Sequence, residues 1–168
     1  MAGEPGELRR KVLRALEADG RRTAAQLAEM TGATAAEIAA EIAACERDGV
    51  IRGYTAIVDW DRAGRERVVA FIDVSVSPQR DVGFDQVAAR IYRHPEVRSV
   101  HLVSGGHDLR VVVEAGTMRE VAAFVSEKLA PIDRVTATNT HFQLKVYKEQ
   151  HVVWSEVAGD DDRLAVAP

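Results

Sequence analysis

Two kinds of hydrophobic periodicity divide the chain. Up to about residue 48, apolar residues recur three or four positions apart, as on one face of an α-helix. Beyond about residue 68, apolar and polar residues alternate over several runs of strand length, and two further helical stripes separate these runs. The pattern predicts an all-helical first part followed by a part that mixes strands and helices.

Three short helices are expected in the first part. The first ends at Asp19-Gly20, and Thr23 can cap the second, in which Leu27 and Met30 face inward.

The third helix begins with a capping-box sequence, Thr34 and Glu37, and its apolar stripe includes Cys45, which is expected to be a buried structural residue. A glycine-containing turn joins the second helix to the third, and Val50 to Asp59 predicts a short extended segment after them. This succession is typical of a winged-helix-like helix-turn-helix domain.

The second part is organised around residues 97–114, two alternating strands joined at Gly105-Gly106. A strand at 68–77 and a helix ending before His94 precede this hairpin, and a helix capped by Thr117 and a strand at 135–147 follow it. The order βαββαβ predicts a ferredoxin-like antiparallel sheet with its first and third strands in the centre and both helices on one face. The expected fold class is therefore α+β.

Alternation also assigns residues to the two faces of this sheet. Residues expected on the inward stripes are Ile72, Val74, Val76, Phe84, Val87, Ala88, Ile91, Tyr92, Leu109, Val111, Val113, Met118, Val121, Ala122, Val125, Leu129, Phe142, Leu144 and Val146. The other face includes Val69, Phe71, Asp73, His101, Val103, Val112, His141 and Gln143. Because this second face is more apolar than water favours, burial against a second copy of the chain is expected.

Composition and charge narrow the classes of function. The chain has 168 residues, 46% apolar and 29% charged, which is typical of a soluble globular protein. No apolar run is long enough for a membrane span and the N-terminus lacks the pattern of a signal peptide, so a cytoplasmic location is expected. A formal charge of −4 gives no overall attraction to nucleic acid, so any such binding needs a local basic surface.

Motifs for enzyme chemistry are missing from the sequence. It contains no Gly-x-x-x-x-Gly-Lys phosphate loop and no paired Cys or His spacing for zinc. We therefore expect no catalytic residues, no metal and no cofactor.

Two segments carry a resemblance to a known family, EADGRRTAAQLAEMTGAT and ERDGVIRGYTAIVDWDRAG. Through them the chain resembles the Lrp/AsnC group of feast/famine transcription regulators. The resemblance implies a regulator that binds DNA through the helix-turn-helix and responds to a small molecule, an amino acid, through a βαββαβ (RAM-type) domain. It also implies a homodimer and higher oligomers.

The expected domains follow from the patterns and the resemblance together. They are a helix-turn-helix domain at 1–59, a linker at 60–67, an effector-sensing and dimerisation domain at 68–148, and a C-terminal extension at 149–168. Within the extension, VVWSEV is expected to add an edge strand or pack on a neighbour, and the acidic run 159–162 to be a solvated linker. The apolar ending RLAVAP can dock on a neighbouring subunit.

The third helix departs from the family pattern, because alanines and glutamates occupy the face expected to be exposed. Glu41 stands where the family commonly has arginine, and it is expected to repel phosphate. The candidates for DNA contact are Arg9, Arg10, Lys11, Arg14, Arg21, Arg22, Thr34, Arg47 and Arg52. The basic residues among them can make backbone contacts or be ordinary solvated residues.

Two segments resemble the family's effector site, which lies near a contact between dimers. The effector-binding candidates are Ser104, Gly105, Gly106, His107, Asp108, Thr136, Thr138 and Thr140. Hydroxyls, backbone amides and a carboxylate suit the charged ends of an amino acid, although turn chemistry and strand alternation explain the same residues. Two alternatives stay open. One is a sensor or assembly protein of this fold that has weak or lost DNA binding, and the other, less favoured, is an enzyme similar to haem-precursor decarboxylases.

Overall fold

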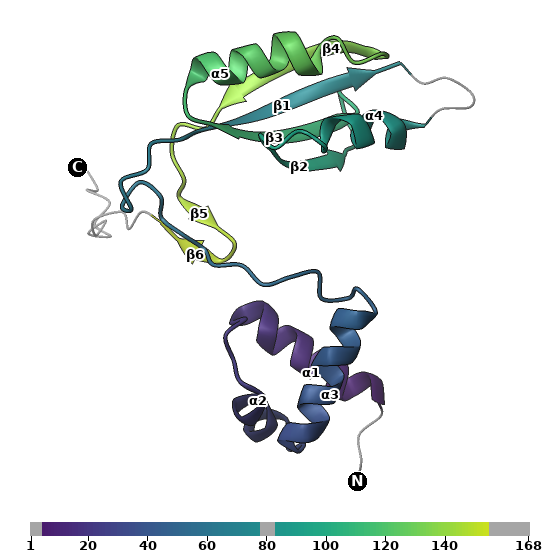
Figure 1. The fold of residues 1–168 in the computed structure, drawn as a ribbon, viewed down its shortest axis with the longest axis vertical. Coiled ribbons are helices and arrows are strands. Elements are labelled where there is room, and N and C mark those ends of the chain that lie inside the picture. Colours follow the sequence, from purple (N-terminus) through teal and green to yellow (C-terminus); the bar gives the residue numbers. More distant parts are fainter. Residues whose placement is uncertain (1–4, 78–82, 155–168) are drawn as a thin grey trace, which may run out of the picture. The chain divides into compact units, whose positions relative to one another are not determined.

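The computed structural model describes residues 5–77 and 83–154 (Figure 1). The chain divides into two compact units between Ile57 and Val58. The described helices include none that is long and apolar enough to cross a membrane.

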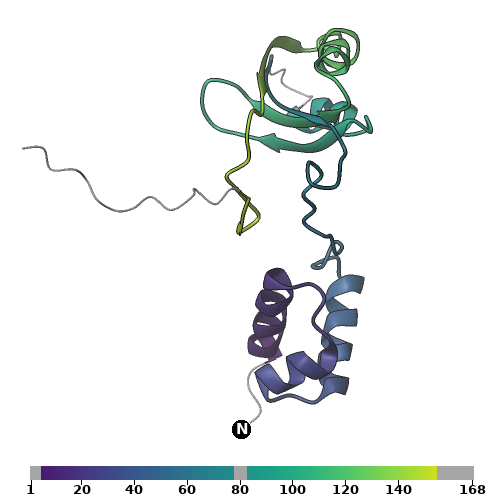
Figure 2. The same cartoon turned by 90° about the vertical axis from the view of Figure 1, so that its left-hand side faces the viewer.

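The N-terminal unit consists of three helices, α1 (Pro5–Ala18), α2 (Ala24–Thr31) and α3 (Ala35–Arg47), which appear together in Figure 2. Their core is formed by Val12, Ala15, Leu16, Leu27 and Ile38. The three helices expected from the sequence are confirmed.

Helix ends in this unit follow the expected capping chemistry. The Thr34 hydroxyl accepts a hydrogen bond from the Glu37 backbone N–H at 3.2 Å, and the Thr34 N–H donates to the Glu37 carboxylate at 2.8 Å. Thr23 forms a similar box with Gln26 at the start of α2. Gly32 ends α2 with a φ of 77°, a left-handed conformation that glycine adopts without steric cost.

Two expectations for the N-terminal unit were wrong. The Met30 side chain is 58% exposed, with its sulfur 2.7 Å from an Arg22 guanidinium nitrogen. The segment 50–59, expected to follow the helices as a strand, pairs with no strand of the described residues, and the Val50 and Ile51 N–H groups instead donate to the Cys45 carbonyl.

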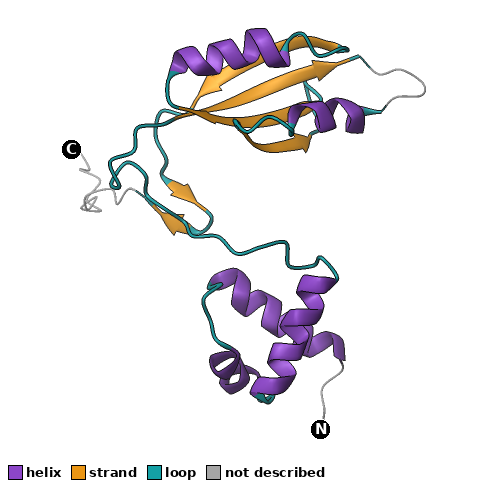
Figure 3. Cartoon of the chain, in the orientation of Figure 1, coloured by secondary structure: helices purple, strands orange, loops and turns teal. Residues whose placement is uncertain are grey.

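The C-terminal unit contains a four-stranded antiparallel sheet with strand order β2-β3-β1-β4 (Figure 1). Its elements are β1 (Val68–Val76), α4 (Phe84–Ile91), β2 (Val97–Leu102), β3 (Leu109–Ala115), α5 (Met118–Ala123), the π-helical η1 (Phe124–Leu129) and β4 (Val135–Phe142). The βαββαβ order and the central positions of the first and third strands are confirmed. Figure 3 shows this mixture of helices and strands, which is an α+β fold.

The core lies between the sheet and the two helices. Ile72 pairs with Val111 and Val74 with Leu109, and all four side chains are buried. The same buried cluster contains Val87 and Ile91 of α4, and Val121, Phe124 and Leu129 of α5 and η1. The helices therefore cover one face of the sheet, and we call the opposite face the outer face.

The inward stripe of the second helix differs from the one expected. Met118 is 57% exposed and Ala122 is also exposed, whereas Phe124 is buried. From Phe124 the helix is π-helical, as the hydrogen bond from the Ala130 N–H to the Val125 carbonyl spans five residues. Met118 and Ala122 lie in α5 before this stretch, with Met118 in the first turn directly after the Thr117 cap.

Some residues near the ends of elements were also placed wrongly. Strand β4 ends at Phe142 rather than at Tyr147, and Leu144 is 92% exposed. The pairing of β4 with β1 ends at Phe142 and Ala70, and one further hydrogen bond joins the Gln143 N–H to the Val69 carbonyl at 2.9 Å. Tyr92 follows the last turn of α4 and is exposed.

A short hairpin follows β4, made of β5 (Lys148–Glu149) and β6 (Val152–Val153) (Figure 1). The expected strand in VVWSEV begins with β6, but Ser155 and the residues after it lie outside the described residues. The solvated acidic run at 159–162 and the docking of RLAVAP also lie outside them.

Candidate functional site

The connected helices α2 and α3 form the candidate nucleic-acid surface. The exposed residues of α3 include Ala35, Ala36, Glu37, Ala39, Ala40 and Ala43. Alanine methyl groups can contact thymine, but they cannot read a base edge through hydrogen bonds. The base-reading capacity of this face is therefore small.

Glu41 does not point freely to solvent as the sequence suggested. Its carboxylate lies 2.6 Å from the Arg9 Nε atom on α1, and another Arg9 nitrogen lies 3.1 Å from the Asp48 carboxylate. The hydrogen bonds that Arg9 donates to Glu41 and then to Asp48 raise the pKa of Arg9. Arg9 thus neutralises Glu41, and Glu41 holds Arg9 within the unit.

The other basic candidates are spread over α1, the α1–α2 connection and the end of α3. Arg21 lies 3.5 Å from Asp19, Arg22 contacts Met30, and Arg47 lies 4.0 Å from Asp48. On α1, Lys11 pairs with Glu7 at 2.8 Å. Arg10 and Arg14 on α1, and Arg52 after α3, are exposed and have no ion pair within 4 Å in the described parts of the chain. Thr34 is engaged in the cap of α3.

The hairpin turn forms the candidate effector site in the C-terminal unit. Ser104, Gly105 and Gly106 are exposed, and Gly105 has a φ of 135°. Asp108 has a structural role, since its carboxylate accepts a 2.8 Å hydrogen bond from the Val76 N–H. Within the described residues, the side chain of Ser104 at the tip of the turn makes no such hydrogen bond.

His107 belongs to a charged group on the outer face, which we call the Asp73 cluster: Asp73, His107, Arg110 and His141. One Asp73 carboxylate oxygen lies 2.9 Å from His107 Nε2 and 2.9 Å from Arg110 Nε, and the other lies 3.4 Å from His141 Nε2. Asp73 is only 11% exposed, and the hydrogen bond from Arg110 lowers its pKa. His101 pairs with Arg110 in the neighbouring strand.

The three threonine candidates do not form one site. Thr138 pairs with Val74 and Thr140 with Ile72, so both lie on the helix-covered face, opposite the Asp73 cluster. The Thr136 hydroxyl instead donates to the Ser75 carbonyl at 3.1 Å. Thr136 and Asp108 therefore bind opposite sides of the Ser75–Val76 peptide unit of β1, Thr136 from β4 and Asp108 from the side of β3.

A second charged group occupies the other end of the outer face, where Glu114 meets three arginines. Its carboxylate lies 2.7 Å from Arg98, 2.9 Å from Arg67 and 3.4 Å from Arg65. Burial acts to raise the pKa of Glu114, but hydrogen bonds from Arg98 and Arg67 outweigh it, and the pKa is lowered. Pattern reasoning missed this group, because its members are brought together by strand register.

The described residues include no group of three or more His, Cys, Asp or Glu side chains that could hold a metal ion. The histidines of the Asp73 cluster share one carboxylate with an arginine, an arrangement that serves as a hydrogen-bonded ion pair.

Comparisons with known proteins agree with the two units. A family model described as the Lrp/AsnC ligand binding domain matches residues 69–153, and a model described as a winged helix-turn-helix DNA-binding domain matches residues 7–52. The Bacillus subtilis HTH-type transcriptional regulator YugG is 45% identical over 159 residues, covering 94% of this chain and 95% of its own.

Two further proteins show the breadth of the similarity. The leucine-responsive regulatory protein of Rhizobium meliloti is 33% identical over 83% of this chain and 88% of its own length. The solved structure of a feast or famine regulatory protein from M. tuberculosis has a TM-score of 0.70 at 24% identity, over 85% of this chain and 94% of that one. The structural match is a likeness of fold.

Proposed function

The chain belongs to the Lrp/AsnC family of transcriptional regulators, and from this premise we propose that it binds DNA and adjusts that binding to an amino acid. The observation that carries the proposal is the presence of both modules in one chain, a capped helix-turn-helix and a ligand-binding βαββαβ domain. As a member of this family it is a regulator rather than an enzyme, so the decarboxylase alternative is set aside.

DNA binding is proposed to rest mainly on phosphate contacts. The face of α3 offers methyl groups rather than hydrogen-bond donors, whereas Arg10, Arg14, Arg47 and Arg52 are exposed basic groups. Arginine contacts with phosphate bind tightly at low salt and weaken steeply as salt rises. We therefore expect strong salt dependence and limited discrimination between base sequences.

The test is fluorescence anisotropy with DNA from the promoter region of the chain's own gene, at about 50 and about 200 mM salt. Arg47→Ala and Arg52→Ala are each expected to weaken binding and to reduce the salt slope by about one. Lys128→Ala, in the C-terminal unit, is the matched control and leaves the slope unchanged. If the native protein binds no DNA at low salt, with or without amino acids, the DNA-binding proposal fails.

That failure would instead support a second candidate, a sensor of the same fold without DNA binding. The specific observation in its favour is the alanine-rich exposed face of α3. In that case amino-acid binding persists while the anisotropy of labelled DNA stays constant.

The effector is proposed to be an amino acid at the hairpin turn. Two solved relatives support the ligand class, because the regulators from Neisseria meningitidis and M. tuberculosis are described as complexes with L-methionine. The exposed amides of Ser104, Gly105 and Gly106 can bind a carboxylate, with His107 and Asp108 beside them. Thr136 binds the same peptide unit of β1 from β4, across the strand from Asp108, and is not part of the proposed site.

Gly106→Leu tests this site, because a Cβ atom added there meets no heavy atom within 4 Å, so the substitution begins in open space beside the turn. It is expected to abolish the effect of methionine on DNA binding. Gly83→Leu, which also meets nothing within 4 Å, is the matched control and retains the effect. An unchanged methionine response in Gly106→Leu would exclude the turn as the effector site.

The outer face is proposed to pair with a second copy. Val69, Phe71 and Val112 lie on it between the two charged groups, and burial of this apolar strip favours association. Phe71→Glu is expected to reduce the mass measured by light scattering, and an unchanged mass would argue against this interface.

A further inference from the structure

The Asp73 cluster lies directly beside the apolar strip of the outer face. His141 of β4 is the register partner of Phe71 in β1, and Asp73 follows Phe71 by two residues on the same face of that strand. The side chains of His107 and His141 are 25% and 53% exposed. A second copy of the chain that packs on Phe71 therefore also covers these imidazoles and removes water from them.

Each imidazole of the cluster faces a hydrogen-bond donor and an acceptor through the same nitrogen. His107 Nε2 lies 2.9 Å from the Asp73 carboxylate and 3.3 Å from an Arg110 guanidinium nitrogen. His141 Nε2 lies 3.4 Å from the Asp73 carboxylate and 3.1 Å from the Asn139 side-chain nitrogen. A neutral ring nitrogen accepts a hydrogen bond from the guanidinium or the amide, whereas a protonated one donates to the carboxylate. Each histidine thus has a partner in both charge states, so proton uptake does not require unfolding.

The charge of the cluster depends on these two protons. While the imidazoles are neutral, the charges of Asp73 and Arg110 cancel, and protonation of both rings adds two positive charges. Two more titratable side chains lie next to the cluster. His101 of β2 is the register partner of Arg110 and adds a further positive charge in acid, whereas the Asp108 carboxylate, which accepts a hydrogen bond from the Val76 N–H, supplies a negative one. This end of the outer face therefore becomes more positive as the pH falls through the range in which histidine titrates.

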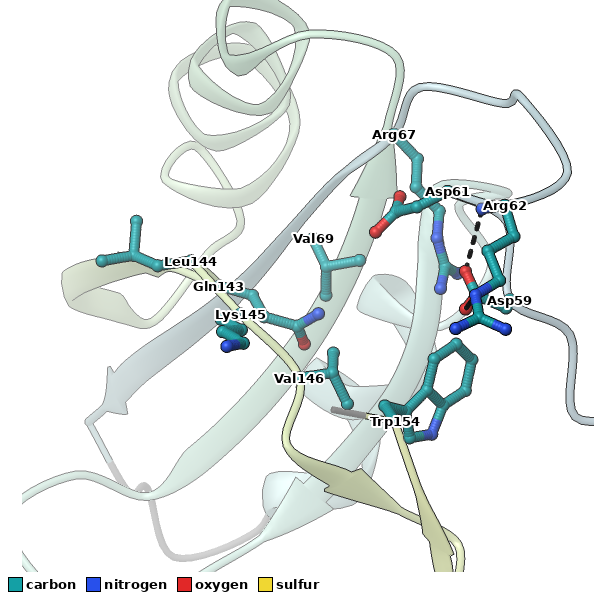
Figure 4. Close-up of a pocket in the computed structure, with 10 residues that line it drawn as sticks. All are labelled: Asp59, Asp61, Arg62, Arg67, Val69, Gln143, Leu144, Lys145, Val146 and Trp154. Carbon is teal, nitrogen blue, oxygen red and sulfur yellow. Dashed lines mark hydrogen bonds and ion pairs between the residues drawn. The ribbon is translucent and has the colours of Figure 1, made fainter. Parts of the chain in front are cut away.

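The opposite end of the outer face keeps its charge in that range. Three guanidinium groups surround Glu114, whose pKa is lowered, so all four groups stay charged from about pH 8 to about pH 5.5. No histidine is among the described residues that line the cavity of about 560 Å³ at this end, which Arg67 and Val69 border (Figure 4). The change in charge between these pH values therefore comes from the Asp73 end.

Pairing brings the added charges close to other positive charges. When two copies pair through the outer face, the Asp73 cluster of one copy lies over either the Asp73 cluster or the Glu114 group of the other. The first is protonated to the same extent, and the second has three guanidinium groups around one carboxylate. Like charges repel one another more strongly where water is excluded. Proton uptake therefore weakens the pair in either arrangement.

We propose that the association of two copies through the outer face is controlled by pH, and that proton uptake by His107 and His141 dissociates the pair. This inference rests on the outer-face pairing proposed above and adds its regulation. By linkage, association also displaces protons from the two histidines, so the pair is more stable where both imidazoles are neutral.

The test is the dissociation constant of the pair, measured on the full chain by sedimentation equilibrium at about pH 8 and about pH 5.5. For the native protein the constant is expected to be at least about tenfold higher at the lower pH. The double variant His107→Gln with His141→Gln keeps polar side chains of similar size but cannot take up the protons, and its constant is expected to change by less than about threefold. Each single variant is expected to give an intermediate change, which decides the matter if the double variant does not fold.

His151→Gln is the matched control. The sequence has five histidines, and His151 is exposed between β5 and β6, with no ion pair in the described parts of the chain. This variant is expected to keep the full native response to pH. A response that is lost in His151→Gln, or kept in the double variant, overturns the assignment to the Asp73 cluster.

Phe71→Glu separates a failure of this inference from a failure of the outer-face pairing. If Phe71→Glu lowers the mass at about pH 8 while the native dissociation constant is the same at both pH values, the pairing stands and its control by pH is overturned. If Phe71→Glu keeps the native mass at about pH 8, the pairing itself fails, and its control by pH falls with it.

Discussion

Replacing Glu114 by glutamine removes one negative charge from beneath three arginines while keeping the shape of the side chain. In the native protein the Glu114 side chain is 7% exposed, and Arg98 and Arg67 approach it within 2.9 Å. Glutamine retains one acceptor oxygen, but it cannot balance the guanidinium charges. The variant therefore isolates the contribution of the carboxylate charge.

The magnitude follows from the burial of the arginines that remain. Removing one partner of a fully buried ion pair costs about 3 to 5 kcal/mol, whereas an exposed pair contributes about 1 kcal/mol or less. Arg65 and Arg98 are each 54% exposed and can turn into solvent, but Arg67 is 19% exposed and keeps an unbalanced charge. We expect Glu114→Gln to lower the free energy of unfolding of the C-terminal unit by about 2 kcal/mol.

Urea unfolding at pH 7, followed by tryptophan fluorescence, measures this change directly. Both tryptophans, Trp60 and Trp154, belong to the C-terminal unit, so the signal reports that unit alone. The midpoint is expected to fall by roughly 1 M urea. Glu127→Gln, at an exposed position, is the control and is expected to change stability by less than about 0.5 kcal/mol. A Glu114→Gln midpoint equal to that of the control would refute the reasoning.

The pH dependence of stability gives a second measure of the Glu114 ion pairs. The folded pKa of Glu114 lies below its ordinary value, so its contribution is complete above about pH 4.5 and is lost as pH falls through the folded pKa. The stability difference between the native protein and Glu114→Gln is therefore expected to be constant from pH 7 to about pH 5 and to shrink below that. If the stability difference between the native protein and Glu114→Gln grows as the pH falls, the lowered pKa of Glu114 is contradicted.

Three further predictions concern other contacts. Asp73→Asn is expected to flatten the loss of stability below about pH 4 in urea titrations, because Arg110 lowers the folded pKa of Asp73 and this contribution is lost as the pH falls through that pKa; an unaltered acid profile would count against it. Glu41→Gln is expected to tighten DNA binding roughly threefold to tenfold at low salt by releasing Arg9, with equal or weaker binding as the contrary result. Thr34→Ala is expected to destabilise the N-terminal unit by about 1 kcal/mol through loss of the α3 cap, seen as faster amide exchange in the first turn of α3, and native exchange rates there would exclude a stabilising cap.

Local sequence chemistry was sufficient for most of the fold. Thr34 with Glu37 and Thr117 each identified the start of a helix, because a capping hydroxyl acts on backbone groups only a few residues away. The alternation at Ile72 and Val74 correctly predicted the buried face of β1, because successive side chains of a regular strand point to opposite faces of the sheet. The wrong assignments of inward-facing residues lie where a regular element ends, as at Leu144, which follows the last residue of β4 that pairs with β1.

The candidate site was less accessible to sequence reasoning. Alternation placed Asp73, His101 and His141 on one face, but the approach of His107 and Arg110 to Asp73 depends on strand register and on the hairpin turn. Glu41 shows the same limit in the N-terminal unit, because its partner Arg9 lies on another helix, far away in sequence. Pairings between distant segments require knowledge of tertiary packing.

The π-helical stretch at Phe124–Leu129 has a consequence for how relatives should be aligned. A hydrogen bond from Ala130 to Val125 encloses one residue more than an α-helical bond, so the stretch is equivalent to a one-residue insertion in an α-helix. A relative with a regular α-helix here is expected to show a one-residue gap within this stretch. Alignments that close the gap elsewhere would match Phe124 or Leu129 to residues of the wrong helical face.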